Sequence, residues 1–434
     1  MSSKRVHLPL SKVATIVGGG TPSTKNGDNW GGEIPWITPK DLSGFSMVYI
    51  SRGERSITKQ GLQNSSAKLI PPNSILYTSR APIGYVAINS VQVATNQGFK
   101  SLVPKEDFDP FYLYYLLKNS KEIILTHASG GTFAEIGATA LGEVELPFPD
   151  FKTQVAIGRL LHDLDEKIRL NTEIAKTLEA IAQTIFKSWF IDFDPVHAKS
   201  RGEQPEGMDV ATAAMFPDSF ESTELGPIPK SWTWGNLGVF TEVIDCLHSK
   251  KPALLEAGLP YLQLDTISDG GVLRYDKAAK ISEQDYRKWT SRIEVTGGDC
   301  LVTNVGRVGA VSQIPQGFRA AIGRNITAIR PKRPQETKTF LISLLTSQYM
   351  KREISLKTDS GTILDALNVR NIPSLKSPIP PSSVLRCFEE SVGPFWAQVH
   401  NLYQENVVLG AVRDSLLPRL ISGELEIPDE LLGE

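Results

Sequence analysis

The sequence is poor in cysteine, with only Cys246, Cys300 and Cys387 among 434 residues. Three cysteines this far apart exclude a disulfide framework and provide no paired spacing for a metal centre. No apolar run is long enough to cross a bilayer, and the opening MSSKRVHLPL lacks the hydrophobic stretch of a secretion signal. We therefore expect a cytoplasmic protein in a reducing compartment, without a membrane segment.

Motifs of catalysis and cofactor binding are also scarce. The stretch GGGTPSTK at Gly18 lacks the Gly-Lys-Ser/Thr ending of a phosphate-binding loop, so it predicts a turn. The six histidines are dispersed, and FIDFDP (Phe190–Pro195) indicates the turn that ends a helix rather than a pair of metal-binding carboxylates. The sequence therefore predicts no catalytic residue, no metal site and no cofactor bound by this chain.

The chain as a whole has almost no excess of one charge, since its formal net charge is only −2. The total hides a segregation along the chain. Net charge is +3 over residues 1–148, −6 over 149–227, +7 over 228–380 and −6 over 381–434. Alternation of this kind indicates two positive segments that meet a polyanion and two negative segments that stay away from it.

The sequence does contain an internal repeat. The stretch ILYTSRAPIGYVAI (Ile75–Ile88) returns as CLVTNVGRVGAVSQI (Cys300–Ile314), with Gly84 and Gly309 as matching turn positions 225 residues apart. The segments IPWITPKDLSG and LPYLQLDTISDGG are related by the same offset. A repeat this long indicates a duplicated domain rather than a solenoid.

Within each repeat, β-branched and aromatic runs broken by Gly, Pro and Asn predict short strands, and only a minority of the residues predicts helix. Thr132 in GTFAE and Thr362 in GTILD each match a capping box at the start of a helix. The alternative is a helix N-terminus aimed at a DNA phosphate, which is less favoured because the acidic third residue disfavours an anion.

Each repeat is followed by a long helix with a coiled-coil pattern. Apolar positions alternate in steps of four and three residues, and the second helix repeats the first at an offset of 231 residues. One asparagine interrupts each stripe, which fixes register at a cost in stability. We expect the two helices to pair antiparallel and to bury each other's stripe. The predicted seam positions are Ile157, Leu161, Leu164, Ile168, Asn171, Ala175, Leu178, Ala182, Ile185 and Trp189 in the first helix and Phe388, Val392, Phe395, Val399, Leu402, Asn406, Leu409, Arg413, Leu416 and Leu420 in the second.

These patterns predict an α+β protein in which two tandem globular domains are separated by two long antiparallel coiled-coil helices. Gly410, Arg413 and Pro418 are expected to weaken the second helix near its end. The expected segments are residues 1–150 for the first domain, 151–192 for the first helix, 193–227 for a linker, 228–380 for the second domain, 381–423 for the second helix and 424–434 for a tail.

Polar loops near the repeated strands provide side chains suited to DNA. Arg and Lys can read guanine, Asn and Gln can read adenine, and all of them can instead grip phosphate. Ordinary solvated surface remains the alternative for each residue taken alone, and the groups around Arg80 and Asn304 are favoured because they flank the repeated strand pair. The candidates are Lys25, Asn26, Lys40, Arg80, Asn96, Gln97 and Lys100 in the first repeat and Lys250, Lys251, Arg274, Asn304, Arg307, Arg324 and Asn325 in the second.

Four segments resemble the specificity subunit of type I restriction-modification systems, and the resemblance covers nearly the whole chain. They are GGGTPSTKNGDNWGGEIPWITPKDLSG from Gly18, TLEAIAQTIFKSWFIDFDPVHAK from Thr177, GMDVATAAMFPDSFESTELGPIP from Gly207 and SLLPRLISGEL from Ser415. The resemblance implies two target recognition domains that bind double-stranded DNA, and association with methyltransferase and restriction/translocase subunits. It identifies no base-reading residue, because these differ between members of the family.

On this interpretation the chain is a non-catalytic recognition subunit, and S-adenosylmethionine, ATP and Mg²⁺ are used by its partners. The two similar helical faces lead us to expect two methyltransferase subunits per chain. Because the repeats have diverged, with Arg80 matching Val305 and Pro82 matching Arg307, the target should be bipartite and asymmetric. Two alternatives remain open at this point: a nuclease that acts alone, and a coiled-coil adaptor that does not touch DNA.

Overall fold

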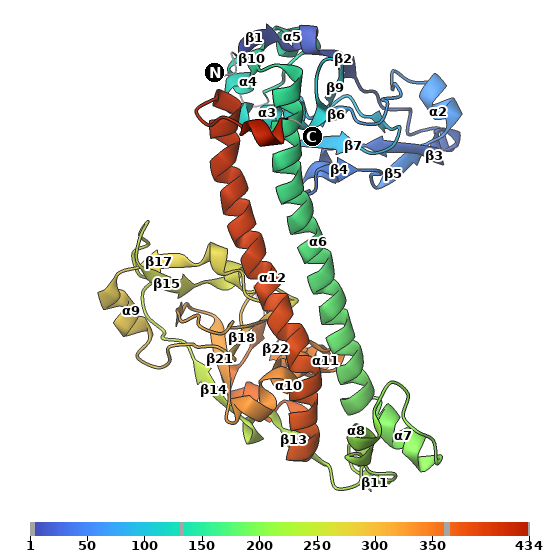
Figure 1. The fold of residues 1–434 in the computed structure, drawn as a ribbon. Coiled ribbons are helices and arrows are strands. Elements are labelled where there is room, and N and C mark those ends of the chain that lie inside the picture. Colours follow the sequence, from blue (N-terminus) through green and yellow to red (C-terminus); the bar gives the residue numbers. More distant parts are fainter. Residues whose placement is uncertain (1–4, 131–133, 360–364, 433–434) are drawn as a thin grey trace. The chain divides into compact units, whose positions relative to one another are not determined.

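The computed structural model describes residues 5–130, 134–359 and 365–432. The chain forms two compact units: unit 1 comprises Met1–Leu170 with Asn406–Glu434, and unit 2 comprises Asn171–Glu405. Two long helices, α6 (Phe151–Phe190) and α12 (Ser382–Ser422), each contribute one part to each unit (Figure 1). The boundary between the units therefore runs through both helices. In the part of the chain that the structure describes, no helix is long and apolar enough to span a membrane.

The core of unit 1 is a five-stranded sheet in the order β2-β9-β6-β7-β4. Its neighbouring strands are antiparallel except for the parallel pair β4 and β7. Helix α3 (Pro110–Asn119) packs on this sheet, and its residues Tyr112–Leu117 are all buried. The strands are β2 (Ala14–Gly18), β9 (Lys100–Pro104), β6 (Ile75–Tyr77), β7 (Val86–Asn89) and β4 (Tyr49–Ile50).

Unit 2 has a five-stranded sheet of the same topology, in the order β14-β21-β18-β19-β16. Ala14 pairs with Pro104 in unit 1 and Thr241 pairs with Pro331 in unit 2, so both partners are shifted by 227 residues. The predicted internal repeat is therefore confirmed in strand order and in register. The strands are β14 (Thr241–Asp245), β21 (Ile326–Pro331), β18 (Cys300–Thr303), β19 (Val311–Gln313) and β16 (Gly271–Val272).

The two glycines that match in the sequence occupy the same turn in each sheet. Gly84 N donates to Thr78 O at 3.1 Å, and Gly309 N donates to Thr303 O at 2.9 Å. Their φ values are +100° and +82°, a region in which a side chain would be strained. The turn geometry thus explains why glycine stands at this position in both repeats.

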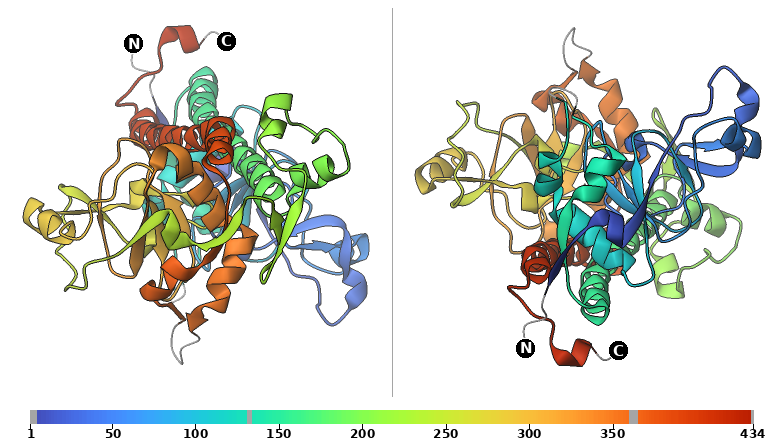
Figure 2. Two further views of the ribbon diagram at one scale, coloured as in Figure 1. Left: turned by 90° about the horizontal axis from the view of Figure 1, so that it is seen from below. Right: turned by 90° about the horizontal axis from the view of Figure 1, so that it is seen from above.

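A smaller three-stranded sheet accompanies each core sheet, in the order β5-β3-β8 in unit 1 and β17-β15-β20 in unit 2. In each unit this sheet extends away from the long helices, with α2 (Lys59–Gln63) or α9 (Glu283–Trp289) near its outer edge (Figures 1 and 2). The strands are β5 (Arg55–Ile57), β3 (Trp30–Ile37), β8 (Ala94–Thr95), β17 (Ala279–Ile281), β15 (Leu259–Leu262) and β20 (Ala321–Ile322).

Shorter elements complete the two units. Thr132 and Thr362, the predicted helix caps, lie outside the described residues. The remaining strands are β1 (Val6–Pro9), β10 (Glu145–Phe148), β11 (Phe220–Thr223), β12 (Gly226–Pro229), β13 (Thr233–Asn236), β22 (Thr358–Asp359), β23 (Ala366–Leu367) and β24 (Lys376–Ile379). The remaining helices are α1 (Leu10–Val13), α4 (Lys121–Thr126), α5 (Ala138–Glu143), α7 (Asp194–Ser200), α8 (Val210–Ala214), α10 (Pro334–Thr346) and α11 (Gln348–Leu356).

Within unit 1 the two long helices run antiparallel, as predicted. Ile157 and Leu161 are buried in one cluster with Leu420, and the Asn406 side chain donates from Nδ2 to the Ile168 carbonyl at 3.3 Å. The seam asparagine of α12 therefore forms a hydrogen bond to α6, and this bond favours one register of the helix pair. Leu164, Leu409 and Leu416 are partly exposed.

Arg413 occupies a seam position in unit 1 without ending the helix, which continues to Ser422. Its guanidinium is hydrogen-bonded to the carboxylate of Asp165 on α6. The second oxygen of Asp165 accepts a 2.6 Å hydrogen bond from the hydroxyl of Tyr115. The Asp165 side chain is only 8% exposed and that of Arg413 is 19% exposed. A buried counter-charge therefore balances the cation that the sequence pattern marked as a weakness.

Within unit 2 the long helices are again antiparallel. The Asn171 side chain donates from Nδ2 to Glu405 Oε2 at 2.9 Å, and Phe186 contacts Phe388 with ring centroids 6.2 Å apart. Among the seam positions of unit 2, Leu178, Ile185 and Phe395 are partly exposed. Those that are buried are Asn171, Ala175, Ala182, Trp189, Phe388, Val392, Val399 and Leu402.

The linker contains a buried aromatic cluster despite its polar and acidic composition. Helix α6 ends at Phe190 and α7 begins with Asp194-Pro195, as expected for a turn that ends a helix. Phe216 lies against Trp189 with ring centroids 5.2 Å apart and near Trp232 at 6.2 Å. These contacts attach the linker to the core of unit 2.

Candidate nucleic-acid interface

In unit 2, polar side chains gather where the parallel strands β15 and β20 end. The carboxyl ends of these strands lie at the same edge of the small sheet, because Gly323 N donates to Leu262 O at 2.8 Å. Gln263 follows β15 directly, and Arg324 and Asn325 follow β20. Asn325 has a φ of +64°, a conformation that Asn tolerates better than most residues.

These residues line a groove of about 550 Å³ together with Lys251, Tyr261, Leu264 and Asp265. The groove combines two cations with two amide side chains, which are the groups that contact phosphates and base edges. Burial raises the pKa of Tyr261 to about 12, so its hydroxyl stays protonated in the groove wall.

The structure thus brings together three of the predicted candidates, Lys251, Arg324 and Asn325. Gln263 and Asp265 also line the groove but were missed by sequence reasoning. The available signal was their place directly after a repeated strand, at the edge that the parallel pairing creates. Loops at such edges commonly carry binding residues.

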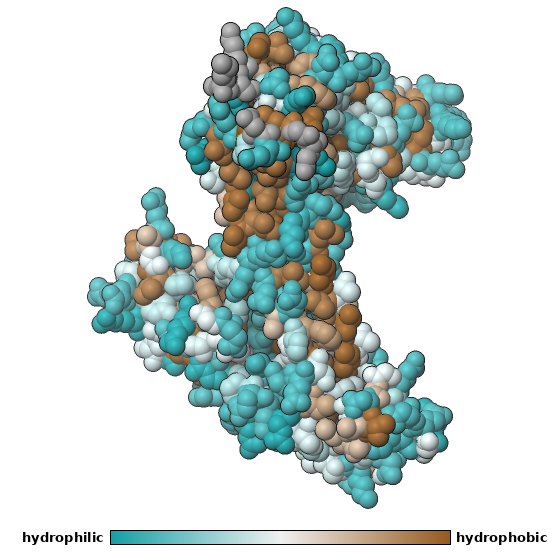
Figure 3. Space-filling view, viewed as in Figure 1, coloured by the Kyte–Doolittle hydropathy of each residue, from teal (hydrophilic) through white to brown (hydrophobic). Residues whose placement is uncertain are grey.

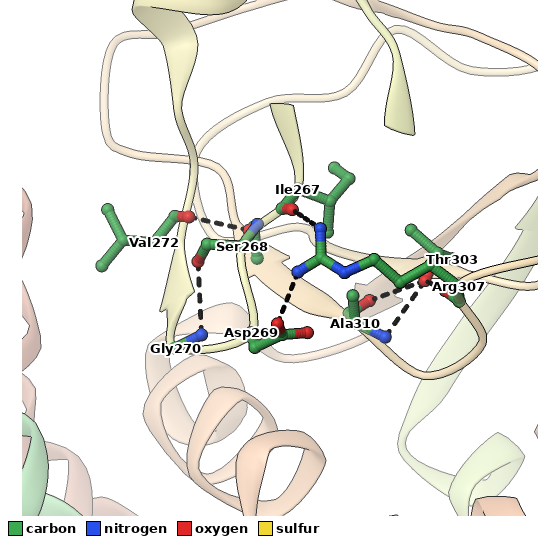
Figure 4. Close-up of polar contacts among 9 residues, drawn as sticks. Ile267, Ser268, Asp269, Gly270, Val272, Thr303, Arg307 and Ala310 are labelled. Atoms are coloured by element: carbon green, nitrogen blue, oxygen red, sulfur yellow. Dashed lines mark hydrogen bonds and ion pairs between the residues drawn. The ribbon is translucent and has the colours of Figure 1, made fainter. Parts of the chain in front are cut away.

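Arg307 does not line this groove and is held by the loop between Ile267 and Val272 (Figure 4). Its Nη1 donates to the Ile267 carbonyl at 2.9 Å, and its Nη2 lies 2.7 Å from Asp269 Oδ2. The side chains of Arg307 and Asp269 are 43% and 73% exposed. Asp269 therefore orients the guanidinium and offsets its charge, which distinguishes Arg307 from Arg324 in the groove.

In unit 1, two predicted candidates converge on one carboxylate. Arg80 Nη1 lies 3.3 Å from Glu135 Oε2, and Lys100 Nζ lies 3.9 Å from Glu135 Oε1. The neighbouring loop repeats the edge seen in unit 2, because Asn96 N donates to Ile37 O at 3.0 Å. Glu135 therefore offsets the charge of both Arg80 and Lys100.

The remaining candidates lie apart from these groups or have structural roles. Asn26 Oδ1 accepts from Asp28 N at 3.0 Å and caps a turn. Lys40 pairs with Glu54 at 2.9 Å, and both side chains are strongly exposed. Asn304 is only 5% exposed and supports the groove through a backbone hydrogen bond to Asn325.

Three further candidates, Lys25, Lys250 and Arg274, are exposed and lie outside the groove. Gln97 is exposed beside Asn96, and its Oε1 accepts from the Thr21 hydroxyl.

One cation that sequence reasoning missed lies on the small sheet of unit 1. The Arg55 guanidinium carbon stands 3.5 Å from the centroid of the Trp30 ring, and Trp36 lies edge-on to Trp30 at 5.0 Å. Arg55 pairs with Trp36 in unit 1, and Ala279 pairs with the equivalent residue Tyr261 in unit 2. Ala279 is therefore the equivalent of Arg55. This stacked arginine is therefore a feature of the first repeat alone.

The cysteines give no support to nucleophilic catalysis. All three are free and buried. Burial raises the pKa of the Cys300 thiol far above its usual range, so this thiol stays protonated and unreactive.

Comparisons with known proteins agree with the two-unit fold. Residues 7–180 match the family described as the type I restriction modification DNA specificity domain. The chain is 32% identical over 429 residues to the type I restriction enzyme MjaIX specificity subunit of Methanocaldococcus jannaschii, with 97% of this chain and 93% of the relative covered. It is 25% identical over 362 residues to the HindI specificity subunit of Haemophilus influenzae, covering 73% of this chain and 77% of that protein.

The fold also matches a crystal structure of the S subunit of a type I restriction-modification system from M. genitalium. The TM-score is 0.61 at 16% sequence identity, and 96% of each chain is covered. One conclusion follows from the repeated sheets, the two long helices and the 32% identity with the MjaIX specificity subunit over nearly the whole of both proteins. This chain belongs to the family of type I restriction enzyme specificity subunits, the non-catalytic subunits that recognise the DNA sequence.

Proposed function

We propose that each unit contacts one half of a bipartite DNA target, unit 2 through the groove at the ends of β15 and β20 and unit 1 through the equivalent edge. The observation that carries this proposal is the convergence of Lys251, Arg324 and Asn325 on one groove with Gln263. Support comes from the net charge of +7 over residues 228–380, because positive charge concentrates DNA near the surface.

The two half-sites should differ in sequence. Ala94 and Ala321 are equivalent, because they pair with the equivalent residues Trp36 and Tyr261. The residue three positions after this alanine is Gln97 in unit 1 and Arg324 in unit 2. The next residue is Gly98 in unit 1 and Asn325 in unit 2. Guanidinium and carboxamide groups favour different bases, so equivalent positions would read different bases.

A lysine in the groove provides a test of the interface. Lys251→Ala in the assembled complex should weaken binding to target DNA and reduce the slope of log K against log salt by about 0.9, since one phosphate contact is lost. Lys250→Ala is the matched control, because Lys250 is exposed next to Lys251 but lies outside the groove. Fluorescence anisotropy over a salt series measures both slopes, and equal slopes for the two variants would contradict the groove as the contact surface.

The assembly would contain two methyltransferase subunits per chain, with restriction/translocase subunits joining it for cleavage. The long helices support this proposal, because apolar side chains remain on their outer surfaces (Figure 3). In unit 2 these are Ile174 and Ile181, which are 47% and 40% exposed. S-adenosylmethionine, ATP and Mg²⁺ would serve the partner subunits, which perform the reactions.

Native mass spectrometry tests the stoichiometry of the complex. We expect the methylating species to contain one copy of this chain and two methyltransferase subunits, since the repeat presents two similar sets of helical residues. A complex with a single methyltransferase subunit as the only active species would contradict this. Of the earlier alternatives, the family assignment supports neither a nuclease that acts alone nor an adaptor that does not touch DNA.

A further inference from the structure

We propose that Asp245, Cys246 and His248 form a binding site for a divalent metal ion, with Zn²⁺ as the preferred occupant. One ligand atom from each side chain lies within 4.8 Å of the other two. The site stands at the end of β14 in unit 2. It departs from the expectation of no metal site, which rested on the spacing of the cysteines, the dispersion of the histidines and the single pair of carboxylates in FIDFDP.

The three side chains need only a small adjustment to surround an ion. His248 Nε2 lies 2.7 Å from Asp245 Oδ2, whereas two ligands of one tetrahedral Zn²⁺ are separated by about 3.3 Å. The His248 side chain is 57% exposed, so a rotation that opens this distance meets little packing. Cys246 is fully buried and fixes the inner side of the site, and Asp245 Oδ1 is buried without a hydrogen-bond partner among the described residues.

The ligand chemistry favours Zn²⁺ over hard cations. A thiolate and an imidazole are ligands that Zn²⁺ accepts and that Mg²⁺ and Ca²⁺ avoid. Burial raises the pKa of the Cys246 thiol, so its proton would leave when the metal binds. The carboxylate and the resulting thiolate would then carry two negative charges, which match one divalent ion. Three protein ligands leave a fourth position for water, as in zinc sites that are not closed by protein.

Arg292 is the cationic competitor for this position. Its Nη1 lies 3.8 Å from Asp245 Oδ2 and donates to the Cys246 carbonyl at 2.9 Å. A metal ion would displace only the longer of these contacts, because the carbonyl is not among the three proposed ligands. The Arg292 side chain is 48% exposed and can keep its charge in solvent.

The first repeat shows that the fold does not require these residues. The register of β2 and β14 makes Gly18, Gly19 and Thr21 the equivalents of Asp245, Cys246 and His248. A Cβ atom at Gly19 would lie 2.0 Å from the Asn96 carbonyl oxygen, so that repeat uses a close backbone approach instead. The three potential ligands therefore belong to the second repeat alone, which favours a role specific to unit 2.

The site would anchor the loop that carries Lys250 and Lys251. This loop starts at the ligand residues and leads into the groove, of which Lys251 forms part. Adding a metal cross-link at the start of the loop would restrict its conformations and hold Lys251 near Arg324. The ion would stabilise this loop conformation despite its open fourth position, and its binding does not depend on the proposed DNA contacts.

Titration of the metal-free full-length chain with Co²⁺ tests the site. A thiolate ligand gives Co²⁺ an intense charge-transfer absorption, and we expect one such ion per chain, displaced by one equivalent of Zn²⁺. Cys246→Ser should abolish the charge-transfer band, whereas Cys387→Ser should keep it, because Cys387 is buried elsewhere and hydrogen-bonded to Thr212.

His248→Ala provides a second variant that leaves the core intact, since its side chain is mostly exposed. We expect it to weaken Co²⁺ and Zn²⁺ binding about tenfold or more. The matched control is His127→Ala, an exposed histidine of unit 1. Absence of the thiolate band in the unmodified chain, or its persistence in Cys246→Ser, would overturn the proposal, as would equal affinities in both histidine variants.

Discussion

Replacing Asp165 by asparagine is expected to lower the free energy of unfolding of unit 1 by about 3 kcal/mol. The substitution leaves the guanidinium of Arg413, only 19% exposed, without its buried counter-charge. Tyr115 also loses the charged acceptor of its 2.6 Å hydrogen bond. We expect the lower end of the range for broken buried pairs, because Arg413 keeps an ion pair with exposed Asp414 at 2.7 Å.

Hydrogen exchange of α3 and of the last turns of α12 measures this loss within unit 1. Glu166→Gln is the control, because Glu166 is next to Asp165 and its carboxylate pairs with the partly exposed Arg169. This substitution should lower the free energy of unfolding by about 0.5 kcal/mol. Adding Arg413→Met to Asp165→Asn should recover most of the stability, since no cation then remains buried. Equal effects of Asp165→Asn and Glu166→Gln would show that the buried pair contributes nothing specific.

Replacing Arg324 by alanine is expected to relax recognition of one base pair in one half-site. A guanidinium that reads a base contributes about 1–3 kcal/mol of discrimination, which corresponds to about 5- to 150-fold between the right and wrong base. The other half-site should be unaffected, because Arg324 belongs to unit 2 and its equivalent in unit 1 is Gln97. Binding of the assembled methyltransferase to duplexes with single substitutions measures both half-sites.

Arg319→Ala is the matched control for this experiment. Arg319 is an exposed arginine of unit 2 that pairs with Glu294 at 3.1 Å and does not line the groove. Its loss should change neither affinity nor specificity appreciably. If Arg324→Ala weakens binding to all sequences alike, Arg324 contacts phosphate, and unchanged binding would remove it from the interface.

The sequence was sufficient to predict the architecture because the repeat and the helix pattern are local signals. Gly84 and Gly309 stand in similar stretches of sequence, which indicated the same turn in two copies of one domain. The apolar residues from Ile157 to Trp189 recur with helical periodicity, which indicated the long helix. Local patterns do not show which distant charge meets a seam residue. Arg413 therefore indicated a weakened helix, whereas Asp165, 248 positions away, stabilises it.

The candidate interface was only partly predictable for the same reason. Residue type alone made Arg307 and Arg324 equal candidates. In the folded protein Arg307 pairs with Asp269, whereas Arg324 lines the groove. Gln263 enters the groove because two parallel strands end at one edge, a pairing that no local pattern predicts. The cluster of Asp245, Cys246 and His248 is different, because it lies within four consecutive residues and was missed only because its spacing matches none of the metal-binding patterns considered.

Sequencing the methylated bases in cells that express this chain with its partner subunits tests whether each unit recognises one half-site. We expect one motif made of two different half-sites, separated by bases that are not read and whose number is fixed. It further predicts that Arg324→Ala degrades one half-site and leaves the other intact. A single continuous motif, two identical half-sites, or a variant that alters both halves together would contradict recognition by one half-site per unit.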